Sequence, residues 1–127
     1  MLSTSSYALS FATVKFLRPN LIEIVVNDGV EITVAMLDEW VDFMLRRGEG
    51  PYYVLVNKVN GYSYSFDAQM HLSSIDCVKA AAVVTYTVTG PFITQSIVEM
   101  LQDDPKWEIE TFAERDAALN WLLLRCE

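Results

Sequence analysis

The chain has 127 residues, of which 52% are hydrophobic and 20% charged, and its formal net charge is −8 at pH 7. This composition excludes a disordered chain, and the acidic balance excludes nucleic-acid binding through neutralised phosphates. No apolar run reaches the length of a membrane span. We therefore expect one domain over residues 1–127, with a single core and a flexible segment at residues 1–6.

The N-terminus shows no basic segment followed by an apolar stretch, because the first basic residue is Lys15. This predicts a cytoplasmic protein. Cys77 and Cys126 are too few for a disulfide framework and lack the paired spacing of a zinc site, so we expect free thiols. Asp103 and Asp104 are adjacent acids before a proline, which indicates a solvated helix end. We expect no metal and no cofactor.

The first half of the chain predicts a β-hairpin and a helix. Large and small side chains alternate over residues 7–12 and more weakly over 21–26, with turn residues at 18–20 between them. Thr33 is placed to cap a helix that ends at Gly48. The apolar face of this helix is predicted to contain Leu37, Trp40, Val41, Met44 and Leu45.

The second half alternates strands with helices. Two continuous apolar runs predict central strands of a parallel sheet, and alternating glutamates predict an edge strand that points them outward. The predicted strands cover residues 52–56, 78–84 and 107–111, and the predicted helices cover residues 66–75, 92–101 and 113–124. The last helix is expected to bury Ala117, Ala118, Trp121 and Leu122.

The predicted order is β-β-α-β-α-β-α-β-α, which indicates an α/β fold with right-handed crossovers. Three segments carry a likeness to a known group: residues 29–33 leading into a helix, residues 54–56 before the loop 63–66, and the ending 112–122. On these segments the chain resembles the STAS (SpoIIAA-like, anti-sigma-factor-antagonist) fold, and within it the stand-alone STAS/Sec14-like bacterial proteins. The resemblance implies a mostly parallel five-stranded sheet with an antiparallel N-terminal hairpin strand.

Members of this group that antagonise anti-sigma factors carry an Asp-Ser-Ser-Gly-like turn after the central strand, where a serine is phosphorylated. The stretch 57–67 occupies the matching place, and Ser63 and Ser65 are the nearest equivalents. The aspartate before the serine and the glycine after it are missing. The resemblance therefore supports the position of this loop and leaves the phosphorylation switch open.

Two loops that leave the carboxyl ends of parallel strands form the predicted binding site, since open α/β sheets bind ligands there. The candidate residues are Asn57, Asn60, Gly61, Ser63, Ser65, Thr87, Thr89 and Gly90. Ser65 has a second interpretation, because its hydroxyl can cap the helix that follows it.

Aromatic residues cluster around the same two loops: Tyr62, Tyr64, Phe66, Tyr86 and Phe92. They either cover the core or line an apolar pocket. His71 is the one histidine and is expected to pair with Asp67 four residues earlier on its helix. Without a second histidine or a nucleophile elbow, nucleophilic catalysis lacks its usual signature.

Two functions remain open at this point. The first is a non-catalytic regulatory domain that binds a protein partner, and the second is a binding module for a small hydrophobic or lipid-like ligand. We also expect a homodimer. Consecutive crossovers in one direction place their helices on one face of the sheet, so the opposite apolar face would need a cover.

Overall fold

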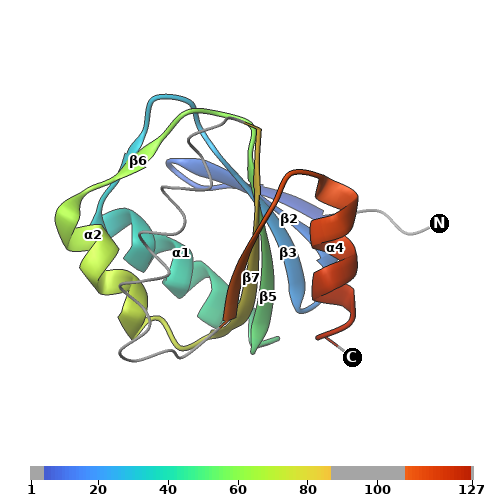
Figure 1. Ribbon diagram of the computed structural model, residues 1–127. Helices are drawn as coiled ribbons and strands as arrows, with labels where there is room; N and C mark the ends of the chain where they lie inside the picture. Colours follow the sequence, from blue (N-terminus) through green and yellow to red (C-terminus); the bar gives the residue numbers. More distant parts are fainter. Residues whose placement is uncertain (1–4, 87–107, 127) are drawn as a thin grey trace.

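The computed structural model describes residues 5–86 and 108–126, and Figure 1 shows their arrangement. The strands are β1 (Ser5–Ala8), β2 (Ala12–Arg18), β3 (Leu21–Val26), β4 (Glu31–Ile32), β5 (Tyr52–Lys58), β6 (Ser63–Tyr64), β7 (Val78–Thr85) and β8 (Glu108–Phe112). The helices are α1 (Val34–Arg47), α2 (Phe66–His71), a 3-10 turn (Leu72–Ser74) and α4 (Arg115–Leu123). The predicted helix 92–101 lies outside the described residues.

Six of the strands form one sheet in the order β1-β2-β3-β5-β7-β8, and β4 pairs with β6 in a separate parallel pair. The first three strands are antiparallel neighbours, whereas the pairs β3–β5, β5–β7 and β7–β8 are parallel. This confirms the predicted α/β class, with six strands in the sheet instead of five. The predicted edge strand is confirmed as β8, with Glu108 and Glu110 exposed.

The N-terminal hairpin differs from its prediction. The partner of Leu21–Val26 is Ala12–Arg18, while Ser5–Ala8 adds a further strand at the edge. In β2 the side chains alternate, so that Val14 and Phe16 are buried and Lys15 is exposed. The sequence carries this alternation. The stronger aromatic pattern at residues 7–11 nevertheless led to a predicted strand that lies N-terminal to β2.

Helix α1 is confirmed with both of its caps. The Thr33 hydroxyl accepts a hydrogen bond from the Met36 N–H at 3.3 Å, and Gly48 adopts the left-handed conformation at φ 69°. Leu37, Trp40 and Met44 are buried as predicted. The prediction was wrong for Leu45, which is 61% exposed.

Helices lie on both faces of the sheet, which corrects the expected one-sided arrangement (Figure 1). Helices α1 and α2 cover one face. The opposite core contains Leu55, Ala82 and Val84 packed against Ala118 and Leu122 of α4. Crossovers that step in one direction do share a face, but α4 follows the edge strand β8 and is no crossover, so it is free to fold back over the other face.

The cover supplied by α4 removes the argument from which a dimer was predicted. Small alanines on β7 allow the helix to approach the sheet closely, and Ala80, Ala82 and Ala118 are at most 1% exposed. The prediction of burial on α4 was wrong for Ala117, which is exposed, while Trp121 is half-buried.

Candidate functional site

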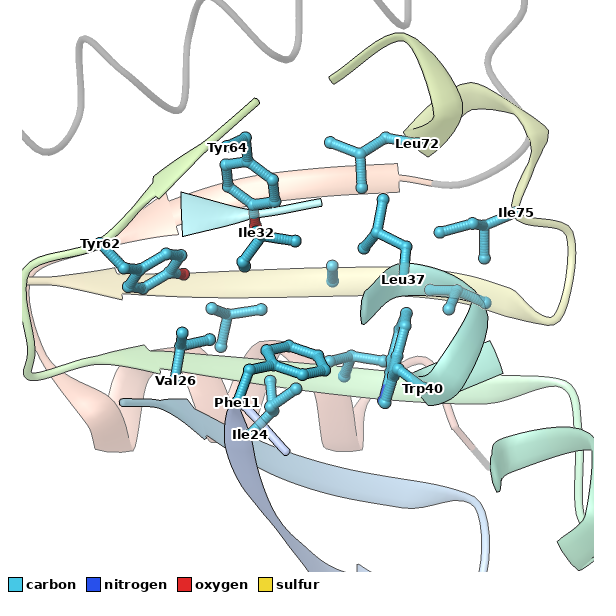
Figure 2. A pocket seen from close by; sticks show the side chains of 14 residues that line it. Phe11, Ile24, Val26, Ile32, Leu37, Trp40, Tyr62, Tyr64, Leu72 and Ile75 are labelled. Atoms are coloured by element: carbon cyan, nitrogen blue, oxygen red, sulfur yellow. The ribbon is translucent and has the colours of Figure 1, made fainter. Parts of the chain in front are cut away.

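An apolar cavity of about 70 Å³ lies between the sheet and the helices α1 and α2 (Figure 2). Strands β3, β5 and β7 form its floor, and α1, β4, β6 and the segment after α2 complete its walls. Among the described residues its lining consists of Phe11, Ile24, Val26, Ile32, Leu37, Trp40, Val54, Val56, Tyr62, Tyr64, Leu72, Ile75, Val78 and Ala81.

Strand periodicity explains why these side chains converge. Ile24 and Val26 are two positions apart on β3, and Val54 and Val56 are two positions apart on β5. Each pair therefore points to the same face of the sheet. Ala81 of β7 is the register partner of Val54 in the middle of the floor. Because its side chain is one methyl group, it leaves room at a position where a valine or leucine would fill the space.

Polar groups reach this apolar surface at a few points. Figure 2 shows the hydroxyl groups of Tyr62 and Tyr64 on the inward side of their rings. Burial raises the pKa of both phenols, so each keeps its proton and can donate a hydrogen bond. The indole N–H of Trp40 is buried and has no hydrogen-bond partner in the described part of the chain. The Tyr62 and Tyr64 hydroxyls hydrogen-bond each other. A few polar groups in an apolar cavity are typical of a small-molecule site.

Beside Tyr62, next to the cavity lining, lies a basic residue that the sequence analysis missed. Lys58 is the last residue of β5, and its Nζ lies 4.8 Å from the centroid of the Tyr62 ring. The available signal was its spacing, since Val54, Val56 and Lys58 alternate and therefore share one face of the strand. Burial lowers the pKa of Lys58.

A polar cluster occupies the opposite face of the sheet. The Glu23 carboxylate, 6% exposed as a residue, accepts hydrogen bonds from Arg115 and from the Asn57 amide at 2.8 Å. The Tyr86 hydroxyl donates to the Asn57 Oδ1 at 2.6 Å. The Arg115 guanidinium is the main cause of the lowered pKa of Glu23. This cluster satisfies a buried charge and fastens α4 to the sheet.

The predicted loop residues are divided between several local roles. The Asn60 amide donates to the Val26 carbonyl at 3.0 Å, and the Gly61 N–H donates to the Asp28 carboxylate at 3.0 Å. Ser63 is exposed on β6. The Ser65 hydroxyl accepts from the Ala68 N–H at 3.1 Å, which is the capping bond of α2. Thr87, Thr89 and Gly90 lie outside the described residues.

The predicted aromatic group is also divided. Tyr62 and Tyr64 line the cavity, with their ring centroids 5.8 Å apart. Phe66 is 73% exposed and Tyr86 is 53% exposed, and neither belongs to the lining. Phe92 lies outside the described residues. The structure therefore places two of these aromatic side chains at the cavity and two on the surface.

The predicted pair of His71 with Asp67 was wrong. The His71 Nε2 lies 3.0 Å from the Asp38 Oδ1, so the histidine joins α2 to α1 instead of pairing along its own helix. Packing of the two helices brings Asp38 closer than the residue one turn away.

In residues 5–86 and 108–126 no group of three or more potential metal ligands is present. None of the helices described there is long and apolar enough to span a membrane.

The mixed sheet, the helix crossovers and the strand order define a SpoIIAA-like α/β fold. A solved structure with this fold belongs to an uncharacterized protein of the DUF3478 family from Shewanella loihica PV-4. It matches this chain with a TM-score of 0.54 and 13% sequence identity, over 94% of this chain and 92% of that chain. At this identity the likeness shows the fold alone. No protein-family model and no curated protein matches the sequence.

Proposed function

We propose that this domain binds a small, predominantly apolar ligand in the cavity between the sheet and the helices α1 and α2. The observation that carries the proposal is an apolar lining that contains a small number of polar groups: the paired hydroxyls of Tyr62 and Tyr64 and, at the other end, the indole of Trp40, whose N–H has no partner among the described residues. An unpaired buried N–H is costly, and a ligand that accepts its hydrogen bond removes that cost. The proposed role is that of a cytoplasmic binding domain without catalytic activity.

Titration with 1-hexanol, followed by amide chemical shifts, tests this function. We expect saturable shifts concentrated at residues that line the cavity. Ala81→Leu should abolish them, because Ala81 lines the floor and the larger side chain would fill the cavity. Ala117→Leu makes the same chemical change at an exposed position of α4 and should leave the titration unchanged. A folded wild-type protein without saturable shifts at the lining would contradict the proposal.

A second candidate function is the binding of a protein partner, including a second copy of this chain. It is favoured by Phe66 at the start of α2, which is 73% exposed, and by Val59 after β5, which is 54% exposed. Large exposed apolar side chains mark interfaces when they gather in a patch. Light scattering at micromolar concentration tests self-association: a dimer that Phe66→Ser converts to a monomer would support this function, and a wild-type monomer would contradict the predicted homodimer.

A further inference from the structure

Lys58 is placed where a ligand in the cavity would meet a positive charge. It continues the face of β5 on which Val54 and Val56 line the cavity. Its register partner on β7 is Thr85, which is 5% exposed, so an ammonium group and a hydroxyl group extend from neighbouring backbone positions. Both residues lie at the carboxyl ends of parallel strands, where α/β sheets bind ligands.

Within the described part of the chain, Lys58 has no ion-pair partner. The side chain is half-buried, and no carboxylate of the described residues lies within ion-pair distance of its ammonium. Its contact with the Tyr62 ring supplies a cation–π attraction. This attraction is weaker than a charge-assisted hydrogen bond to an anion. Burial accordingly lowers the pKa of Lys58.

The hydroxyl groups near Lys58 fit the same kind of ligand. Tyr62 and Tyr64 stay protonated and hydrogen-bond each other, which leaves one phenolic proton that can be donated to a ligand. A ligand that matches this surface carries hydrogen-bond acceptors and a negative charge at one end. The chain as a whole has a net charge of −8, so attraction of an anion must come from this local arrangement.

The size of the cavity limits the apolar part of a ligand. Its volume is about 70 Å³, whereas a dry apolar cavity of roughly 150 Å³ holds a benzene molecule. The space therefore accommodates roughly three non-hydrogen atoms, so the rest of a longer ligand extends from the cavity toward Lys58. Building on the proposed function, we infer that the ligand is a short amphipathic carboxylate, whose apolar body fills the cavity and whose carboxylate pairs with the Lys58 ammonium beside Tyr62.

Paired titrations with sodium hexanoate and 1-hexanol test this inference, because the two probes share the apolar body and differ in charge. Wild-type protein should bind hexanoate more tightly than hexanol. Lys58→Gln should weaken hexanoate binding about tenfold, the loss expected for one partly screened charge-assisted bond. The same variant should change hexanol binding less than twofold. Lys58→Arg, which keeps the charge, should retain the preference for hexanoate.

Lys79→Gln is the matched control, since Lys79 is exposed at the opposite end of β7 and does not line the cavity. It should leave both titrations unchanged. Hexanol binding without a preference for hexanoate, or equal loss of both probes in a folded Lys58→Gln variant, would overturn the inference and leave the proposed function standing. Failure of wild-type protein to bind either probe would overturn both.

Discussion

The carboxylate of Glu23 and the guanidinium of Arg115 form a two-point ion pair across 92 positions of the sequence, with N···O distances of 3.0 and 2.6 Å. Glu23 lies on β3 and Arg115 opens α4, so the pair holds the final helix against the face of the sheet opposite the cavity. Asn57 donates to the same carboxylate, and Tyr86 donates to Asn57. Asn57, which the sequence predicted to bind a ligand, thus supports the packing of α4.

Loss of Arg115 should destabilise the protein substantially. Arg115→Met leaves the buried Glu23 carboxylate with Asn57 as its remaining side-chain donor among the described residues. Removal of one partner from a fully buried pair costs about 3–5 kcal/mol. The Arg115 side chain is 36% exposed, so water screens part of the interaction and we expect a loss of about 2 kcal/mol in the free energy of unfolding.

Urea denaturation of Arg115→Met beside Arg46→Met measures this loss. Arg46 pairs with Asp42 on the surface of α1, where the two side chains are 78% and 60% exposed. The Arg46 variant should lose at most about 0.5 kcal/mol. Equal losses in the two variants would show that burial of Glu23 adds nothing to its pairing with Arg115.

Stability should also depend on pH through Glu23. Its pKa in the folded protein is lowered from the ordinary value of 4.5, first by the hydrogen bond from Arg115. The unfolded chain therefore binds a proton more readily than the folded chain, so this contribution is fully present above pH 4.5 and is lost as the pH falls through the folded-state pKa.

Urea denaturation at pH 7, 5, 4 and 3 compares wild-type protein with Glu23→Gln. The difference in the free energy of unfolding should be constant at pH 7 and 5 and should shrink below pH 4.5. Other carboxylates lower the stability of both proteins in acid and cancel in the difference. A difference that grows toward pH 3 would reverse the assigned sign.

Capping by Ser65 predicts a separation of stability from binding. Ser65→Ala removes the hydroxyl that accepts from the Ala68 N–H and should cost about 1 kcal/mol. Ser65→Asp can accept the same bond and should restore most of that stability. Thermal melts measure these changes in stability. Hexanol titration measures binding, which Ser65→Ala should leave intact. Unchanged stability with lost hexanol binding in Ser65→Ala would make this serine part of the binding site.

The two glycines that join the turns beside β3 and β5 should respond differently to substitution. The Gly29 N–H donates to the Gly61 carbonyl at 2.7 Å. Gly29 adopts φ +78°, so Gly29→Ala should cost about 1 kcal/mol. At Gly61 a new Cβ would meet the Asp28 carboxylate at 3.6 Å, which is an ordinary contact. Gly61→Ala should therefore be nearly neutral, and urea midpoints of the two variants provide the comparison.

The sequence was sufficient for features that neighbouring residues decide. Thr33 and Gly48 mark the ends of α1, and Ser65 marks the start of α2, because capping hydrogen bonds join residues three or four positions apart. The central strands were likewise predicted from continuous apolar runs, since strands covered on both faces need apolar side chains at every position.

Tertiary structure alone decided the side of the sheet that α4 covers, the ion pair of Glu23 with Arg115 and the contact of His71 with Asp38. Each depends on contacts between segments far apart in the chain, and local pattern does not specify which segments meet. The cavity also depends on contacts between distant segments, because its lining comes from strands and helices between Phe11 and Ala81. Its volume depends on how closely their side chains pack, which periodicity along one strand does not determine.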